Sequence, residues 1–176
     1  MEIQVIEATD VDLPVICNMA RFYVYDMSEF TGWAFDADGS WDLGAGMGKY
    51  WGRQPQKDDR PWPADWRGFP FLIRADGELA GFALVKQIGP ETFDMGEFFV
   101  ARKYRRHDVG RIAATTLFDM FKGSWEVREL LLNQPAQKFW RRIIGDHLSG
   151  AFQETQEHFA VYGRDFIVQR FVSGIS

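Results

Sequence analysis

A cationic loop in the second half of the chain has residue types and spacing that could bind phosphate. The segment EFFVARKYRRHDVGRIAATTLF begins at Glu97 with an apolar, strand-like stretch, continues through a basic loop and ends in helical periodicity. Free amides at a helix start carry partial positive charge and bind anions, and Gly110 would allow close backbone approach. The loop region holds five cationic residues: Arg102, Lys103, Arg105, Arg106 and Arg111. Taken alone, it predicts either a site for one or two phosphates or a solvated basic turn.

Other residue types that carry chemistry are sparse. His107, His147 and His158 show no metal-ligand spacing, and no Gly-x-Ser-x-Gly motif is present. Cys17 is the single cysteine of the sequence and lies on the apolar face of a predicted helix, which favours core packing over a reactive thiol. One cysteine excludes an intrachain disulfide and fits a reducing compartment, so we expect a cytoplasmic protein with no bound metal.

Composition indicates one globular domain, residues 1–176, with 46% hydrophobic and 26% charged residues. The net charge of −5 and a pI near 5.2 argue against a general nucleic-acid binder, which normally has a basic balance. No run of 18 apolar residues could cross a membrane, and the first residues lack a signal peptide's basic start. We therefore expect neither a nucleic-acid partner nor a membrane partner.

Periodicity predicts alternating strands and helices, hence an α/β sheet with helices on its faces. Asp76-Gly77 between two apolar stretches predicts a tight hairpin. Strands are expected at 3–8, 69–75, 78–88, 93–100, 124–132, 151–160 and 164–172, and helices at 9–30, 108–122 and 133–147. Residues 31–68, rich in Gly, Pro, Asp and Trp, read as a long loop with one short helical stretch near its middle. Such a loop is either functional or a packed insertion.

Two motifs carry a family resemblance over roughly residues 70–145. KYRRHDVGRIAATTLF resembles the acetyl-CoA signature of the GNAT superfamily of N-acetyltransferases, Arg/Gln-x-x-Gly-x-Gly/Ala, with Arg105 at its first position and Gly110 at its last. Asp108 stands where the first glycine of that signature usually lies. NQPAQKFW is similar to the family's Asn-x-x-Ala-x-x-Phe/Tyr pattern at Asn133, Ala136 and Phe139.

The resemblance implies a GNAT-like fold: a mixed, mostly antiparallel, twisted sheet of six to seven strands flanked by about four helices. It implies acetyl-CoA as acyl donor, with amides near Phe99, Val100 and Ala101 holding the pantetheine arm and polarising the thioester carbonyl. The pyrophosphate and arm would be held by Arg105, Arg106, His107, Asp108, Val109, Gly110, Arg111, Asn133, Ala136 and Phe139. The Asp108 side chain is expected to cap the helix or to face solvent, paired with a neighbouring arginine.

Glu97 is the candidate general base that removes the proton of the attacking amine, since many family members carry a Glu on this strand. The alternative is that Glu97 faces a sheet edge or pairs with an arginine, and Asp94 is a second candidate. Trp140 stands where many members carry a Tyr that protonates the leaving thiolate, and an indole N–H cannot act as a general acid. Either Tyr104 or Tyr162 takes that role, or the thiolate leaves unaided.

By the same resemblance, the acceptor amine enters near the first helix. Tyr25, Asp26, Glu29 and Trp33 are the candidate acceptor-binding residues, with Tyr23 and Trp41 nearby, and would form an acidic, aromatic pocket for a cationic amine. The alternative is that these residues only solvate the surface and pack the loop. We expect a small-molecule or peptide amine as acceptor, and a homodimer formed through an unpaired final strand. The rival hypotheses are an acyl-CoA-binding module that has lost catalysis and, least favoured, a nucleic-acid binder.

Overall fold

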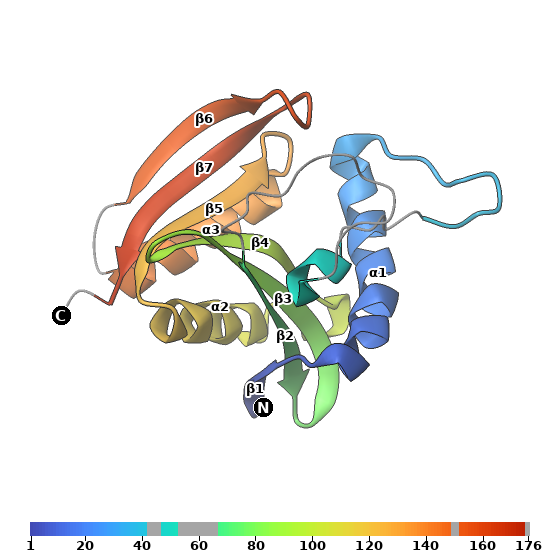
Figure 1. The fold of residues 1–176 in the computed structure, drawn as a ribbon, viewed down its shortest axis with the longest axis horizontal. Helices are drawn as coiled ribbons and strands as arrows, with labels where there is room; N and C mark the ends of the chain where they lie inside the picture. Colours follow the sequence, from blue (N-terminus) through green and yellow to red (C-terminus); the bar gives the residue numbers. More distant parts are fainter. Residues whose placement is uncertain (42–46, 53–66, 149–151, 175–176) are drawn as a thin grey trace.

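A mixed seven-stranded sheet forms the centre of the protein in the computed structural model (Figure 1). The structure describes residues 1–41, 47–52, 67–148 and 152–174. The strands lie in the order β1-β2-β3-β4-β5-β7-β6, and every neighbouring pair is antiparallel except β4 and β5, which are parallel. Their bounds are β1 Ile3–Glu7, β2 Arg67–Ala75, β3 Glu78–Gly89, β4 Thr92–Val100, β5 Gly123–Leu130, β6 Gln153–Phe159 and β7 Arg164–Ser173.

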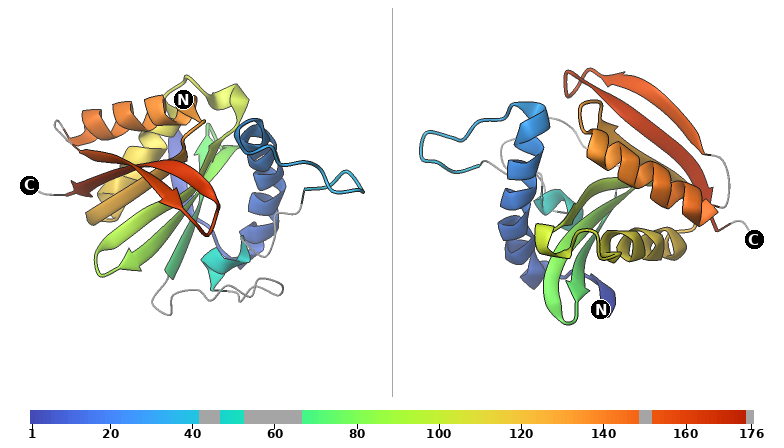
Figure 2. Two further views of the ribbon diagram at one scale, coloured as in Figure 1. Left: turned by 90° about the horizontal axis from the view of Figure 1, so that it is seen from above. Right: turned by 180° about the vertical axis from the view of Figure 1, so that it is seen from behind.

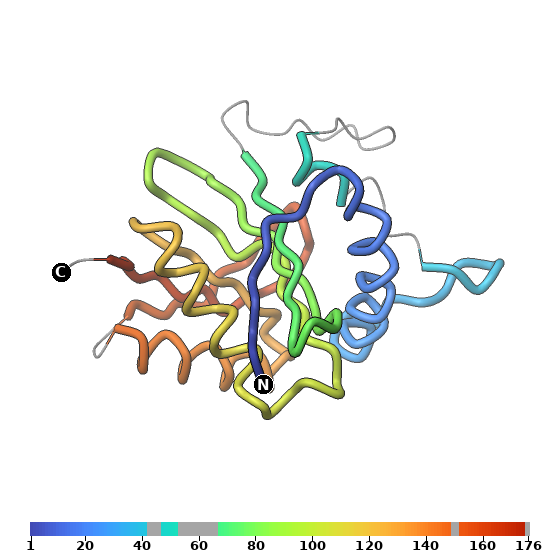
Figure 3. The backbone as a smooth tube through the Cα atoms, turned by 90° about the horizontal axis from the view of Figure 1, so that it is seen from below, coloured from blue at the N-terminus to red at the C-terminus, as the bar shows by residue number. Residues whose placement is uncertain are grey.

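Three α-helices in the described part of the chain cover the two faces of this sheet. Helix α1, Leu13–Thr31, packs on one face, while α2, Val109–Met120, and α3, Gln134–Leu148, lie together on the other (Figures 2 and 3). Short 3₁₀ helices occur at Asp10–Asp12, Gly48–Trp51 and Arg102–Tyr104. The sheet is thus covered on both faces, and a site between its strands lies between two layers of helices.

Helix α1 follows from its sequence. Pro14 lies in the first turn, where its missing N–H costs nothing. Ile16 and Ala20 are four residues apart, so they share one face and are fully buried against the sheet. The helix ends at Gly32, which adopts the left-handed conformation with φ of 68° and donates its N–H to the carbonyl of Ser28.

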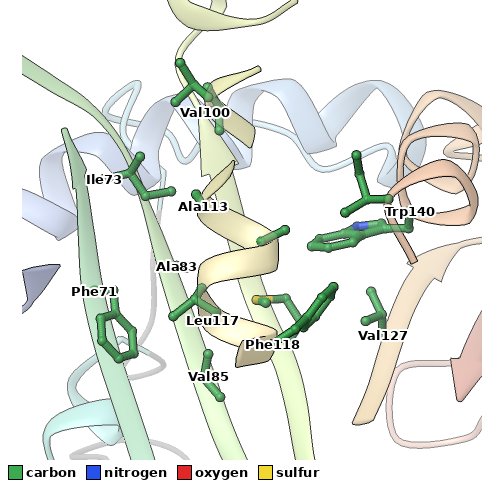
Figure 4. Packing of buried hydrophobic residues seen from close by; sticks show 14 of the residues in the cluster. Phe71, Ile73, Ala83, Val85, Val100, Ala113, Leu117, Phe118, Val127 and Trp140 are labelled. Carbon is green, nitrogen blue, oxygen red and sulfur yellow. The ribbon is translucent and has the colours of Figure 1, made fainter. Parts of the chain in front are cut away.

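The face covered by α2 and α3 holds the larger core (Figure 4). Ala113, Leu117 and Phe118 of α2 have no exposed surface and pack toward strand residues such as Ile73 and Val127. Each large side chain that is fully buried contributes about 1.5–3 kcal/mol to folding. This core fixes α2, and with it the loop that precedes α2, against the ends of the central strands.

Strands β4 and β5 separate halfway along their length. Their parallel ladder runs only from Thr92 to Met95 of β4. Next in β4 comes a bulge, because Leu84 and Val85 of β3 pair with Glu97 and Met95 and leave Gly96 without a partner. A Cβ at position 96 would lie 2.2 Å from the Tyr50 hydroxyl oxygen and 2.5 Å from Cε of Lys86, so any other residue here would have to displace the ends of these two side chains. Beyond the bulge, the edge of β4 faces β5 across a gap.

The predicted fold class is confirmed: the sheet has seven strands, mostly antiparallel, with helices on both faces. The final strand was expected to be an unpaired edge, and this was wrong, because β7 pairs with both β5 and β6. The exposed edge on that side is β6. The short helical stretch expected within residues 31–68 corresponds to the 3₁₀ helix Gly48–Trp51, whereas residues 42–46 and 53–66 lie outside the described residues.

Candidate active site

A cavity of about 430 Å³ lies at the gap between β4 and β5. On the side of α1 it is lined by Tyr23, Met27 and Thr31, and on the side of α3 by Ala136 and Trp140. The cavity therefore joins the two faces of the sheet. Such a passage allows two molecules that enter from opposite faces to meet inside the protein.

The bulge at Gly96 places two carboxylates on one wall of this cavity. Asp94 and Glu97 are three residues apart, which in a regular strand would put them on opposite faces. Because Gly96 is an extra residue, Asp94 pairs in register with Lys86 and Glu97 with Leu84, two positions of β3 that share the face toward α1. Both carboxylates line the cavity.

Their surroundings differ. The Asp94 side chain is 1% exposed and forms ion pairs with Lys86, at 3.6 Å, and with Arg128 of β5. Each of its two carboxyl oxygens is thus paired with a cation, which commits Asp94 to structural ion pairs. Glu97 instead neighbours the buried Tyr23 hydroxyl, and burial, followed by the Glu97 charge and its hydrogen bond with Tyr23, raises the pKa of Tyr23. Of the two, Glu97 is the carboxylate placed to accept a proton.

A third carboxyl group, that of Glu129 on β5, behaves differently. The residue is 4% exposed, and neither of its carboxyl oxygens has a hydrogen-bond partner in the described part of the protein. Burial, and secondarily the charge of Glu154, raises the pKa of Glu129 to about 8, although Arg141 acts in the opposite direction. Glu129 is therefore mostly neutral at pH 7.

The loop between β4 and α2 presents a run of free backbone amides. After the Arg105 amide, the next backbone amide that donates a hydrogen bond to an earlier carbonyl is that of Ile112, which donates to Asp108 at 2.9 Å. In the described structure, the amides from Arg106 to Arg111 donate no hydrogen bond, and they lie at the positive end of the α2 dipole. This is the arrangement that binds a pyrophosphate.

Arg105, expected to contact phosphate, is committed to structural contacts. Its Nε donates to the carbonyl of Val100 at 2.7 Å, and its guanidinium pairs with Asp26 of α1. Arg102 pairs with the same carboxylate at 2.8 Å. Burial alone would raise the pKa of Asp26, but hydrogen bonds from Arg105 and then Arg102 outweigh burial and lower it. Asp26 thus ties α1 to the basic loop.

Asp108 adopts the left-handed conformation, with φ of 59°, where the family signature has glycine. Its side chain makes no capping hydrogen bond but accepts one from Arg111 at 3.1 Å. The expected pairing with a neighbouring arginine is therefore present. The missing side chain of Gly110 has a different role, because a Cβ there would lie 3.2 Å from the Phe139 ring, so this glycine lets α2 approach α3.

The amides of β4 that face the gap can be identified from the ladder. The Ala101 amide donates to Ala80 of β3 at 2.8 Å. Since amides alternate in direction along a strand, Phe99 also points toward β3, whereas Phe98 and Val100 point toward the gap. The amides of Phe99 and Ala101, expected to bind the pantetheine arm, therefore point away from the gap. The amides of Phe98 and Val100 are the candidates instead.

The start of α3 closes the cavity. Asn133 accepts a hydrogen bond from the Ala136 amide at 3.2 Å, as an N-cap does, and both residues line the cavity. Trp140 also lines it and packs edge-on against Phe98 with ring centroids 5.1 Å apart. Phe139 contacts Phe98 and Trp140, which is a packing role.

The predicted acceptor-binding residues do not lie together at the cavity. Trp33 lines it, but Tyr25 and Glu29 are exposed on α1 outside the lining, and the Asp26 carboxylate is held by arginines. The loop that follows α1 projects away from the body of the protein (Figure 1). On the α1 side the cavity is lined by Tyr23, which the sequence analysis named beside these candidates, and by Met27 and Thr31, which it did not.

Four missed residues of the described lining are cations: Lys49 in the 3₁₀ helix Gly48–Trp51, Lys86 on β3, Arg128 on β5 and Arg164 at the start of β7. They lie far apart in the sequence, and each could equally have been a solvated surface residue. Arg128 could have been identified from the sequence, because it is a charged residue between Val127 and Glu129 on a strand that is otherwise apolar at its end. Nothing local distinguishes Lys49, Lys86 or Arg164.

Of the two tyrosines considered as proton donors to the thiolate, Tyr162 lines the cavity and Tyr104 does not. Tyr104 is buried and donates its hydroxyl hydrogen to Glu78.

In the described part of the chain, no group of three or more His, Cys, Asp or Glu residues is arranged to hold a metal ion. None of the helices described is long and apolar enough to span a bilayer.

Comparisons with known proteins agree with this geometry. Residues 27–145 match the model of the acetyltransferase (GNAT) family. No curated protein sequence matches the chain. Among solved structures, the chain is similar to the alanine N-acetyltransferase of a ribosomal protein from Escherichia coli, with 15% identity, a TM-score of 0.58 and coverage of 99% of this chain and 96% of that one. A chimeric spermidine N-acetyltransferase from Vibrio cholerae and a human homologue has 11% identity, a TM-score of 0.59 and coverage of 98% and 96%. Nourseothricin acetyltransferase has 18% identity, a TM-score of 0.58 and coverage of 99% and 100%.

Proposed function

The chain belongs to the acetyltransferase (GNAT) family, and we propose that it transfers the acetyl group of acetyl-CoA directly to a primary amine. The observation that carries this proposal is the row of free amides from Arg106 to Arg111 beside the gap between β4 and β5. The amides can bind the diphosphate of acetyl-CoA, and the gap can accommodate its narrow pantetheine arm. The residues present therefore fit the donor that the family uses.

Each part of the chain has a defined task in this reaction. Acetyl-CoA supplies an activated acyl group, and the amides of Phe98 and Val100 stabilise negative charge on the thioester oxygen. The Glu97 carboxylate accepts a proton from the ammonium group, which frees the nitrogen lone pair to form the new C–N bond as the C–S bond breaks; the second proton that the nitrogen loses goes to the departing thiolate or to water. Asp94 forms ion pairs with Arg128 and Lys86 and so positions these two side chains.

The departing thiolate has two routes. A thiol has a pKa near ~8.5, so the thiolate can leave without a proton at neutral pH. Tyr162, which lines the cavity, is the candidate donor if one is used. Trp140 can donate a hydrogen bond to the thiolate but not a proton.

The acceptor is proposed to be a small molecule or a peptide end whose amine arrives as an ammonium ion. Two of the similar structures are an N-acetyltransferase of a ribosomal-protein alanine and a spermidine N-acetyltransferase, so this fold serves both classes of acceptor. We place the protein in the cytoplasm, which its single cysteine supports. Any homodimer would use the exposed edge of β6, since β7 is internal.

The second candidate function is an acyl-CoA-binding module with little catalysis. Two observations favour it: a carboxylate at Asp108 in the pyrophosphate loop and an indole at Trp140. The two functions separate in one experiment, in which calorimetry measures acetyl-CoA binding and release of free thiol measures turnover with an amine panel. We expect micromolar binding together with amine-dependent thiol release. Binding without any turnover supports the module, and no binding at millimolar acetyl-CoA contradicts both.

A further inference from the structure

The cavity wall is rich in cations although the chain as a whole is acidic. Among the described residues that line the cavity, four are cationic: Lys49, Lys86, Arg128 and Arg164. The carboxylates there are Asp94 and Glu97, while Glu129 is mostly neutral at pH 7 because burial raises its pKa to about 8. The whole chain carries a formal charge of −5, so this local excess of positive charge is opposite in sign to the protein's average.

One carboxylate cannot neutralise the two cations beside it. Asp94 contacts both Lys86 and Arg128, and the side chains of all three are largely buried, with exposed fractions of 1%, 13% and 20%. Burial lowers the pKa of Lys86, and the charge of Arg128 lowers it further. Burial also lowers the pKa of Arg128. The trio therefore holds one more cation than anion in a poorly solvated place, and the more distant charges of Glu97, near Lys86, and Glu157, near Arg128, act against this excess.

Arg164 is a further cation of the same cavity wall. Its single hydrogen bond goes to a neutral group, the carbonyl of Thr31 at 2.8 Å, and none of the described carboxylates pairs with it. Arg164 lies opposite Phe159 in the β6–β7 register, so their side chains leave the sheet on the same face. The guanidinium of Arg128 lies over the ring of Phe159, 5.3 Å from its centroid. The two arginines therefore flank one aromatic side chain of the cavity wall.

We infer that the acceptor is zwitterionic: beside its amine it carries an anionic group, a carboxylate or a phosphate, which Arg128 and Arg164 bind while Glu97 receives the amine. This inference rests on the proposed acetyl transfer and names its substrate class. Arginine's planar fork matches carboxylate and phosphate oxygens, and an anion between two guanidiniums would offset their buried charge. Phe159, Tyr162 and Trp33 supply apolar surface for the rest of the molecule.

A polycationic acceptor fits this wall poorly. A second ammonium group would meet Arg128 or Arg164, and like charges at close range in a partly buried site repel strongly. The acidic residues that would have suited a polyamine do not line the cavity, because Asp26 is paired with Arg102 and Arg105. The acidic pocket expected from the sequence is thus replaced by a cationic one.

The test uses matched acceptors that differ in the anionic group. The probes are phenylalanine with phenethylamine, lysine with cadaverine, and phosphoethanolamine with ethanolamine. Binding of each is measured by calorimetry to the protein saturated with unacetylated CoA, and acetylation is measured separately with acetyl-CoA. We expect at least one member that carries the anionic group to bind at least ~10-fold more tightly than its partner that lacks this group. Preference within the amino-acid pairs identifies a carboxylate, and preference within the last pair identifies a phosphate.

The variant Arg164→Gln keeps a donor for Thr31 but removes the charge. We expect it to reduce the preference for the anionic member by at least ~10-fold, through KM rather than kcat, whereas Arg164→Lys retains part of the preference. Arg74→Gln is the matched control, because Arg74 also donates only to a backbone carbonyl, that of Gly77 at 2.8 Å, but lies outside the cavity. Thermal unfolding and acetyl-CoA titration confirm that each variant is folded.

Two results would overturn the inference. One is that, in every pair, the member without the anionic group binds as tightly as its partner or more tightly. The other is that Arg164→Gln, still folded, keeps the preference within twofold. Because binding is measured with CoA present and without turnover, a protein that binds zwitterions selectively yet transfers no acetyl group would contradict the proposed function and leave the acceptor class intact.

Discussion

The basic loop between β4 and α2 and the charged wall of the cavity both hold arginines beside acidic side chains, but they use them differently. In the loop, Arg102 and Arg105 are held in ion pairs with Asp26, and Arg111 in one with Asp108, which leaves the backbone amides to meet a ligand. In the cavity, the side chains themselves retain charge. A site built from consecutive backbone amides can be recognised from a local sequence motif. A site built from side chains of α1, β3, β4, β5 and β7 has no such motif, because its residues lie far apart in the sequence.

The largest expected effect is on the cavity side, at Glu97. The variant Glu97→Gln keeps the shape of the side chain but cannot accept a proton, so kcat should fall by about 10²–10⁴-fold. The Kd for acetyl-CoA should stay within about twofold, since Glu97 faces α1 and not the loop. Steady-state kinetics and calorimetry check both values.

Glu7→Gln is the control for Glu97→Gln, because Glu7 is an exposed carboxylate on β1, at the far edge of the sheet. A loss of kcat below about threefold in Glu97→Gln would show that another group, or water alone, accepts the proton.

Glu129 gives the next largest effect, on stability. Its pKa is raised to about 8 in the folded protein against an ordinary value of 4.5, so the folded state holds a proton that the unfolded chain has lost. The stability from this group is complete below about pH 4.5 and is lost as pH rises through 8. At ~1.4 kcal/mol per pKa unit the loss is on the order of 4–5 kcal/mol, an upper limit if the site relaxes.

Glu129→Gln should therefore be more stable than the wild type at pH 8, and the two should converge toward pH 5. Urea unfolding from pH 5 to pH 8 measures the difference, with Glu7→Gln unfolded in parallel. A constant difference across this range would mean that Glu129 is not protonated in the fold.

A smaller effect is expected where the two regions are joined, at Asp26. Removing the carboxylate in Asp26→Asn leaves Arg102 and Arg105 without their anion and should lower the free energy of unfolding by about 1–2 kcal/mol. Since the pKa of Asp26 is lowered, the wild type should lose this contribution as pH falls below about 4.

The control for Asp26→Asn is Glu29→Gln, at an exposed acid on the same helix that forms no ion pair with the described residues. Equal stabilities for wild type and Asp26→Asn in urea would mean that the link between α1 and the loop contributes nothing.

The smallest effect is at Asp108, in the loop. Asp108→Gly relieves the left-handed strain and removes a negative charge from the pyrophosphate site, and should tighten acetyl-CoA binding by about 3–10-fold. Asp108→Asn removes the charge but keeps a side chain that tolerates this conformation, so it separates the two causes. Weaker binding in both variants would indicate that Asp108 contacts the ligand through a bridging group.

The sequence was sufficient for the fold and for the loop, because both depend on local patterns. Asp76-Gly77 specified its hairpin, the alternation along β4 specified a strand, and the spacing from Arg105 to Gly110 identified the helix start. The direction of the β4 amides could not be predicted from the sequence, because it depends on which carbonyl of β3 accepts the hydrogen bond of the Ala101 amide. The partners of Asp26 lie 76 and 79 positions away, beyond any local signal.

The bulge explains why the cavity could not be predicted. A bulge is one extra residue whose effect depends on the facing strand, and here it reverses which face Glu97 occupies. Once it is known, Asp94 and Glu97 fall on one wall and Arg128 opposite. The arginines of β5 and β7 join them only through pairings between distant strands.

Backbone amide hydrogen exchange, measured by NMR with and without acetyl-CoA, tests the central claim most directly. The account predicts that amides from Arg106 to Arg111, which have no hydrogen bond in the protein, and those of Phe98 and Val100 slow by at least about tenfold when acetyl-CoA is added, while β6 is unchanged. Unchanged exchange across residues 98–111 at saturating acetyl-CoA, or protection confined to another region, would contradict it.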